Sequence, residues 1–184
     1  MLRLSALLLL VFAFGSDAAP KPAPILSRVT PNEIALYQAY LRDSLSHSKS
    51  PAKMWFVDSE TWPYATETAC DVKLEQQGVS RALIQSVRDL GTARYLIPAF
   101  DIGFAKTFDP YAKTVNGTAP NFPFTTQTFS RVAFSQDGKQ AFFHVTWLTS
   151  APNRIPSGTG RDILAEQQGA TWRFSTGGCV EFID

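Results

Sequence analysis

The sequence predicts an α+β domain in which N-terminal helices pack on a C-terminal antiparallel sheet. Apolar residues recur at helical spacing in residues 34–45 and 83–90, whereas polar and apolar residues alternate between turn signals in the last third of the chain. Helices followed by a meander of antiparallel strands are typical of this class. A helix wrapped by a curved sheet, as in cystatin-like and nuclear-transport-factor-like folds, is one arrangement of this kind.

The first helix is predicted from its cap. In Thr30-Pro31-Asn32-Glu33, Thr30 is the N-cap, Pro31 takes the first helical position and Glu33 reaches back to the cap. The helix should end at residues 46–48, before Pro51. Its apolar face has four members at helical spacing and three that widen it: Ile34, Tyr37, Leu41 and Leu45, then Ala35, Leu36 and Tyr40.

A short strand at residues 54–57 and a second helix at residues 80–90 are expected next. Gly91 is the predicted stop of that helix. Residues 94–104 are expected to mix strand and loop, and residues 107–128 to form a long ordered loop anchored by phenylalanines. The apolar face of the second helix consists of Leu83, Ile84, Val87 and Leu90.

The pattern in the last third of the sequence predicts strands joined by tight turns. Residues 128–134 and 140–149 form a hairpin around Asp137-Gly138. Residues 161–167 and 171–174 form another, which turns at Gln168-Gly169, and residues 180–183 form a last short strand. We interpret Ser157-Gly158-Thr159-Gly160-Arg161 as a hairpin connection and not a phosphate-binding loop, because a strand rather than a helix follows it.

The composition is that of one folded domain. Of 184 residues, 45% are hydrophobic and 18% are charged, unlike disordered chains, which combine low hydrophobicity with high net charge. The 17 Lys and Arg against 16 Asp and Glu give a formal charge of +1. We therefore expect no nucleic-acid partner, since such proteins carry a basic excess.

The N-terminus has the pattern of a signal peptide. A basic start at Arg3 precedes an apolar run from Leu4 to Phe14 and then small residues, which place the cleavage after Ala18. The run is too short to cross a bilayer, which needs about 20 apolar residues. We expect a secreted or periplasmic protein that leaves the membrane after cleavage. Residues 19–29 are then a Pro/Ala-rich linker, and residues 30–184 a single α+β domain. Asn116 begins a formal glycosylation triplet.

The two cysteines, Cys70 and Cys179, predict a disulfide in an oxidising compartment. It would close a loop of about 110 residues and stabilise the fold by about 4–5 kcal/mol in the chain-entropy model. A catalytic cysteine is the weaker alternative. No metal site or cofactor is expected, because Cys-x-x-Cys spacing is absent and the chain has only two histidines.

Six residues form the candidate polar cluster: Asp58, Glu60, Thr61, Ser130, Arg131 and His144. Asp58 and Glu60 lie two apart in a strand, so their carboxylates face one side as an acid–base pair or cation site, or else form a solvated strand end. Arg131 is expected to be partly buried with Asp58 or Glu60 as its partner. A triad of Ser130, His144 and Asp58 lacks the Gly-x-Ser-x-Gly turn, so His144 is expected to be an outward-facing or hydrogen-bonded sheet residue.

Aromatic residues are numerous, and most should be core. Some are expected to line an apolar pocket between helix and sheet, where small ligands commonly bind. The candidates lie near predicted strand ends: Trp55, Trp62, Trp147 and Trp172.

Four segments carry a resemblance: residues 129–134, 140–145, 158–160 and 169–172. They resemble a group of uncharacterised exported bacterial proteins with a Ser-Arg-Val-Gly-Phe strand, an aromatic strand after a turn, a Gly-x-Gly segment and a Gly-Lys-Trp-like turn. An Asp-x-x-Thr segment of that group is matched by residues 58–61, whereas Ala133 and Thr171 depart from its usual Gly and Lys. The resemblance implies an exported location and a shared fold, and no activity.

We therefore expect a binding or structural protein rather than an enzyme. The main functional alternative is a pocket for a small apolar or aromatic ligand, and a protein partner is the other option. A hydrolase using Asp58 or Glu60 ranks last.

Overall fold

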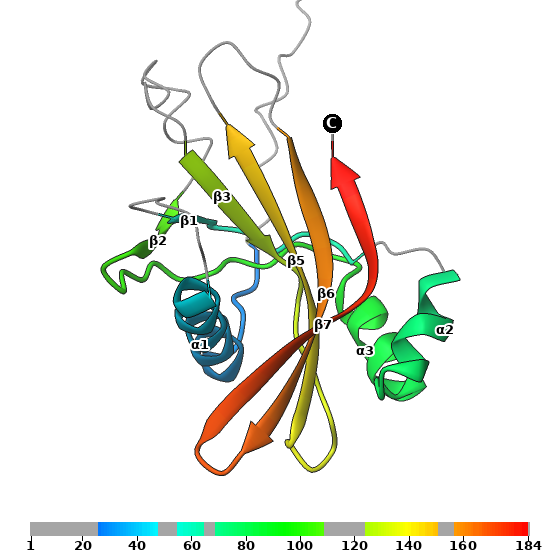
Figure 1. The fold of residues 1–184 in the computed structure, drawn as a ribbon. Helices are drawn as coiled ribbons and strands as arrows, with labels where there is room; N and C mark the ends of the chain where they lie inside the picture. The colour runs from blue at the N-terminus through cyan, green and yellow to red at the C-terminus, as the bar shows by residue number, and fades with distance from the viewer. Residues whose placement is uncertain (1–25, 48–54, 65–68, 109–123, 151–156, 184) are drawn as a thin grey trace, which may run out of the picture.

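The computed structural model describes residues 26–47, 55–64, 69–108, 124–150 and 157–183. A strongly twisted sheet separates helix α1 (Pro31–His47) from helices α2 (Ala69–Gln76) and α3 (Arg81–Leu90), as Figure 1 shows. The helices precede most of the sheet, so the α+β prediction is confirmed. The predicted signal peptide, most of the linker, Asn116 and much of the predicted 107–128 loop lie outside the described residues.

Within the described residues the sheet has seven strands, six of them in the order β2-β1-β3-β5-β6-β7, while β4 pairs with β5 beside this path. β1 is parallel to both β2 and β3, and the other pairs are antiparallel. The strands are β1 (Trp55–Asp58), β2 (Ala105–Phe108), β3 (Phe124–Phe129), β4 (Ala133–Phe134), β5 (Gln140–Ser150), β6 (Ser157–Gln168) and β7 (Thr171–Ile183).

The predicted cap of α1 is confirmed. The backbone N–H of Thr30 donates to Oε2 of Glu33 at 2.8 Å, and the N–H of Glu33 donates to Oγ1 of Thr30 at 3.3 Å. The buried stripe of the helix is Leu36, Tyr37, Tyr40 and Leu41 together with Glu33. Ala35, which was expected on this face, is exposed.

Helix α3 also begins and ends as predicted. Ser80 caps it by accepting from the N–H of Leu83, and the helix closes at Gly91. Its apolar side packs on the opposite face of the sheet from α1, against Phe142 and Leu164. The sheet thus has a core on each face, one under α1 and one under the α2–α3 pair.

Several local expectations were wrong. Helix α2 and strand β2 were not predicted, and both described ends of the predicted 107–128 loop are strand, because β2 runs to Phe108 and β3 begins at Phe124. Residues 128–134 are not one strand, because β3 ends at Phe129 and β4 begins at Ala133. Residues 157–161 lie inside β6 and are not a hairpin connection, since they pair with β5 from Ser157 onward. Residues 180–183 continue β7 past Gly178, whose positive φ of 71° bends the strand without ending it.

The partner predicted for Arg131 was also wrong. Arg131 is buried as expected, but it pairs with Glu33 and not with Asp58 or Glu60: its Nε donates to Oε1 of Glu33 at 2.6 Å and its Nη2 to Oε2 at 3.1 Å. The N–H of Val132 donates to the same carboxylate at 3.1 Å. Burial acts to raise the pKa of Glu33, but these bonds outweigh it and hold the pKa below the ordinary value of 4.5.

Removing one partner of this ion pair should destabilise the fold strongly. Arg131→Met leaves the Glu33 carboxylate buried without its cation, and we expect the free energy of unfolding at pH 7 to fall by about 3–5 kcal/mol. The pair stabilises the fold while Glu33 is ionised, so the difference should shrink as the pH falls through its lowered pKa. Urea unfolding at pH 7 and at pH 3 measures both effects.

The matched control is Arg81→Met, which removes an exposed ion pair with Glu75. Its unfolding midpoint should stay close to that of the parent protein. Equal losses in the two variants would contradict the buried anchor.

Candidate functional site

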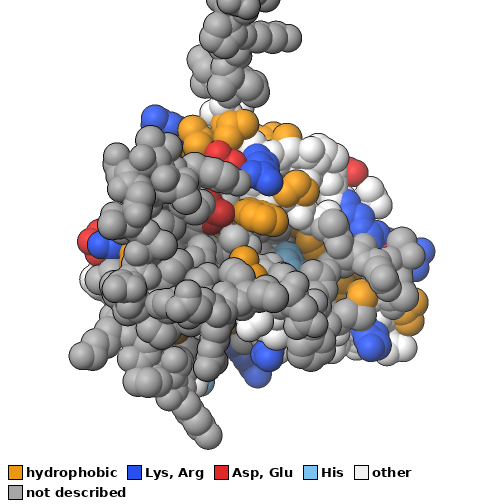
Figure 2. All heavy atoms as spheres, turned by 90° about the horizontal axis from the view of Figure 1, so that it is seen from above, with side chains coloured by type: hydrophobic (Ala, Val, Ile, Leu, Met, Phe, Trp, Pro, Cys, Tyr) orange, Lys and Arg blue, Asp and Glu red, His pale blue; other side chains and the backbone are white. Residues whose placement is uncertain are grey.

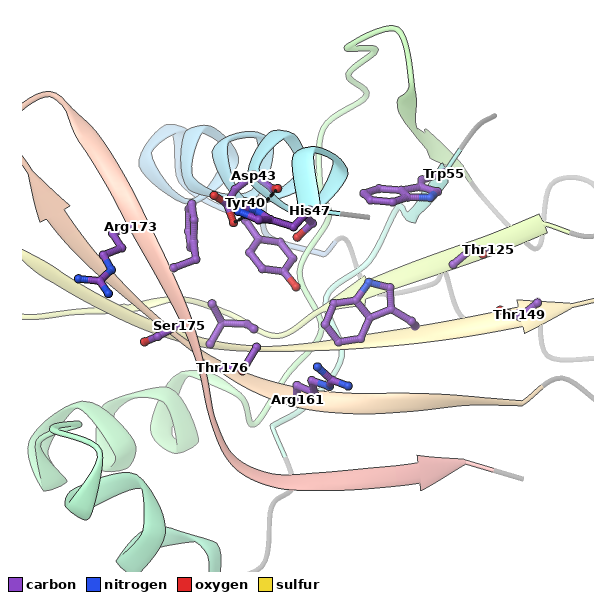
Figure 3. Close-up of a pocket in the computed structure, with 14 residues that line it drawn as sticks. Tyr40, Asp43, His47, Trp55, Thr125, Thr149, Arg161, Arg173, Ser175 and Thr176 are labelled. Carbon is purple, nitrogen blue, oxygen red and sulfur yellow. Dashed lines mark hydrogen bonds and ion pairs between the residues drawn. The ribbon is translucent and has the colours of Figure 1, made fainter. Parts of the chain in front are cut away.

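A cleft with a volume of about 900 Å³ lies between the C-terminal half of α1 and the sheet. In Figure 3, Tyr40, Asp43 and His47 come from α1, and the facing wall is formed by strands of the sheet. The volume is in the range of small-molecule sites. The lining residues are Tyr40, Asp43, Ser44, His47, Trp55, Thr125, Trp147, Thr149, Arg161, Ile163, Arg173, Phe174, Ser175 and Thr176.

Aromatic rings form the inner end of the cleft. Tyr40 points from α1 toward the sheet (Figure 3), where its ring centroid lies 5.4 Å from that of Phe174 and 6.3 Å from that of Trp147. Trp55 lines the cleft from β1. Two of the four predicted pocket aromatics, Trp55 and Trp147, are therefore at this site.

The other two predicted aromatics lie elsewhere. Trp62 is 43% exposed beyond the end of β1, with Arg94 over its ring at 5.2 Å. Trp172 lines a smaller hollow of about 400 Å³ with Asn32, Phe134 and Gln167, near the start of α1. The spacing of aromatics along the chain did not separate these places, because each tryptophan lies near a strand end.

The polar lining differs between the two walls. On α1, Nδ1 of His47 lies 3.7 Å from Oδ2 of Asp43, and both side chains are exposed to solvent. The sheet contributes hydroxyls and the guanidinium of Arg161. Arg161 forms no ion pair with any residue in the part of the chain that the structure describes. The site therefore offers an unpaired cation, Arg161, beside an aromatic wall.

Gln127 is a second polar side chain near the cleft without an interaction partner among the described residues. It pairs with Trp147 across the sheet and follows Thr125 by two residues, so it shares their face. It is fully buried, and neither atom of its amide has a hydrogen-bond partner among the described residues. An unsatisfied buried amide costs about 1–3 kcal/mol. Sequence reasoning placed Tyr40 on the apolar face of the first helix but missed it and Arg161 as site residues, and strand alternation would have placed Arg161 and Gln127 on the α1 face.

The predicted cluster of Asp58, Glu60 and Thr61 is engaged structurally. Oδ2 of Asp58 accepts from the indole N–H of Trp62 at 3.0 Å, and Oδ1 accepts from the N–H of Glu60 at 3.1 Å. Burial raises the pKa of Asp58 despite these bonds. Glu60 pairs with Arg94 at 3.4 Å, and Oγ1 of Thr61 accepts from the N–H of Tyr95. The two carboxylates therefore hold separate partners and do not converge.

Ser130 and His144 lie together on the other face of the sheet. Nδ1 of His144 lies 2.9 Å from Oδ1 of the fully buried Asp162, its cross-strand neighbour. His144 is thus hydrogen-bonded within the sheet, as expected, but its acid is Asp162 and not Asp58. Oγ of Ser130 accepts from the backbone N–H of His144 and donates to the carbonyl of Arg131, so this hydroxyl is held by backbone groups.

The surface has no single-sign character on the face shown in Figure 2, where side chains of both charges are scattered among hydrophobic ones. Within the described ranges, no group of three or more His, Cys, Asp or Glu side chains gathers closely enough to hold a metal ion. None of the described helices is long and apolar enough to pass through a bilayer.

Comparison with known proteins gives no assignment: no family model, no curated protein and no solved structure matches the chain. The resemblance to a group of exported bacterial proteins stays a prediction. The function of the chain is therefore inferred from its own geometry. The cleft beside α1 is the candidate site, because it combines aromatic rings with the unpaired guanidinium of Arg161.

A substitution at Gly178 tests whether the Asp162 carboxylate lies beside His144. A Cβ at Gly178 would collide with Oδ2 of Asp162, and φ is 71° there. Gly178→Ala should therefore cost clearly more than Gly169→Ala, where φ is 64° but a Cβ meets nothing. Backbone strain alone costs about 1–2 kcal/mol. Equal losses of unfolding free energy would show that the Asp162 carboxylate lies elsewhere.

Proposed function

We propose that this chain is an exported binding protein that holds a small ligand in the cleft between α1 and the sheet. The observation that carries the proposal is the cleft itself, a concave site of about 900 Å³ in which aromatic rings lie beside polar and charged side chains, with a volume in the range of small-molecule sites. A purely structural domain needs no such opening, since protein interiors are otherwise close-packed.

The lining favours an amphipathic ligand over a purely apolar one. Tyr40, Trp147 and Phe174 offer ring faces and edges, but hydroxyls of threonine and the Arg161 guanidinium share the same wall. A fully apolar ligand would bury these groups without hydrogen bonds, at a cost for each. A ligand with a flat apolar body and a polar end satisfies both kinds of lining.

The same proposal includes that the protein is exported and that Cys70 and Cys179 form a disulfide. Cys70 is 4% exposed in α2, and Cys179 lies in β7. The two elements touch near these positions, because the N–H of Gly178 donates to Oε1 of Gln77 at 2.9 Å. No cysteine in the described part of the chain is free. A disulfide between them fits an oxidising compartment and would fasten α2 to the edge of the sheet.

Thiol titration checks the disulfide directly. Denatured, unreduced protein should show no reactive thiol, and reduction should release two. Reduction should also lower the free energy of unfolding by about 4–5 kcal/mol, because it frees a loop of about 110 residues in the unfolded chain. Two thiols before reduction would contradict the bridge.

Filling the cleft should abolish ligand binding. Thr176 is paired with Ile163 on the α1 face, so Thr176→Trp should occupy the cleft. An aromatic fragment present at tenfold its Kd stabilises the parent protein by about 1.4 kcal/mol and raises Tm by about 3–6 °C. That shift should vanish in Thr176→Trp.

The matched control is Thr171→Trp, because this exposed threonine of the same strand does not line the cleft. Its shift should equal that of the parent protein. Shifts retained in both variants would place the binding site outside the cleft, and a library of aromatic and amphipathic fragments that shifts nothing would overturn the proposal.

A further inference from the structure

Arg161 is a cation that the fold turns toward α1. It pairs across the sheet with Val145, which is fully buried on the α1 face, so the two side chains share that face. Its charge reaches the phenol of Tyr40: burial raises the pKa of Tyr40, and Arg161 opposes this effect. The guanidinium therefore stands near the aromatic end of the cleft.

An irregularity in β6 lies at the same residue. β6 pairs with β5 in continuous register through Arg161, but its register against β7 shifts between Gly160 and Asp162. Such bulges re-aim a side chain and are common beside functional sites. Here the shift separates Arg161, on the α1 face, from Asp162, which bonds His144 on the other face.

The rings beside Arg161 suit a flat group. The planes of Tyr40 and Trp147 meet at 50° with their centroids 6.3 Å apart. Planar rings bind such walls by edge and face contacts.

The charged side chains of the cleft limit the number of negative charges that a ligand can carry. Arg161 is the cation that the α1 face of the sheet supplies to the lining, and Asp43 lines the opposite wall. Arg173 is also in the lining, but its neighbour Phe174 packs on Tyr40, so alternation directs the Arg173 side chain to the other face. Figure 3 shows it directed away from α1. One guanidinium facing one carboxylate favours a single negative charge over a polyanion.

We infer that the cleft binds a planar aromatic monocarboxylate, with its carboxylate on Arg161 and its ring against Tyr40 and Trp147. Guanidinium and carboxylate match in a two-bond geometry, which fixes the orientation of the ligand. The inference rests on the proposed function, and it adds the chemical class of the ligand and the residue that selects it.

The experiment compares 2-naphthoate with its neutral analogue 2-naphthamide by calorimetric titration of the purified protein. The parent protein should bind the carboxylate at least about tenfold more tightly than the amide. Arg161→Gln should remove that preference by weakening 2-naphthoate alone, and Arg161→Lys should restore part of it. Arg42→Gln is the matched control, because Arg42 is exposed on α1 and does not line the cleft, and it should leave both affinities unchanged.

The outcomes separate the two proposals. Equal affinities for the two probes, unaffected by Arg161→Gln, would leave a ligand-binding cleft and overturn the assignment to Arg161. Equal losses in Arg161→Gln and Arg42→Gln would reveal general electrostatic attraction and overturn it as well. Failure of both probes to bind the parent protein would overturn the cleft as a site for aromatic ligands, and the inference with it.

Discussion

The buried carboxylate of Glu33 is the interaction on which the arrangement of this fold depends. It accepts from the N–H of Thr30, from the guanidinium of Arg131 and from the N–H of Val132. One side chain thus caps α1 and fastens it to the segment between β3 and β4. The ion pair is buried, and such pairs stabilise only when further hydrogen bonds satisfy the charge. Here the two backbone donors meet that condition.

The cleft follows from where this anchor lies. Glu33 and Tyr37, whose hydroxyl donates to the carbonyl of Ser130 at 2.7 Å, hold the N-terminal half of α1 against the sheet. The lining residues of α1 begin at Tyr40 and run to His47. The helix is therefore fixed to the sheet in its N-terminal half, and the cleft lies beside its C-terminal half. The sheet is strongly twisted, because successive strands rotate relative to one another (Figure 1).

Local signals predicted the elements that carry them, and long-range pairing stayed hidden. The cap at Thr30, the Gly91 stop of the helix at residues 80–90 and the Asp137-Gly138 turn each depend on residues within a few positions, and all were found. The partner of Arg131 lies 98 residues away, and nothing in the sequence favours Glu33 over Asp58. Helix α2 has almost no amphipathic pattern, so its sequence did not predict it. It is held instead by contacts with β7 and by the ion pair between Asp71 and Arg88 of α3.

Only part of the candidate site was predicted, again because long-range pairing is not visible in the sequence. Trp55 and Trp147 were found because aromatic residues at strand ends commonly line pockets, but that argument applies equally to Trp62 and Trp172. Arg161 was hidden by the expectation that residues 157–161 form a turn, whereas they pair as strand. Once the register is known, alternation alone places Arg161 and Gln127 on the face of α1.

The four tryptophans allow the most direct test of the central claim, that the cleft beside α1 is the ligand site. Each indole N–H gives its own resonance in a ¹H–¹⁵N spectrum, so two reporters inside the cleft can be compared with two outside it. Titration with 2-naphthoate should shift the resonances of Trp55 and Trp147 and leave those of Trp62 and Trp172 in place. Shifts confined to Trp62 or Trp172, or no shift at any of the four, would contradict the account.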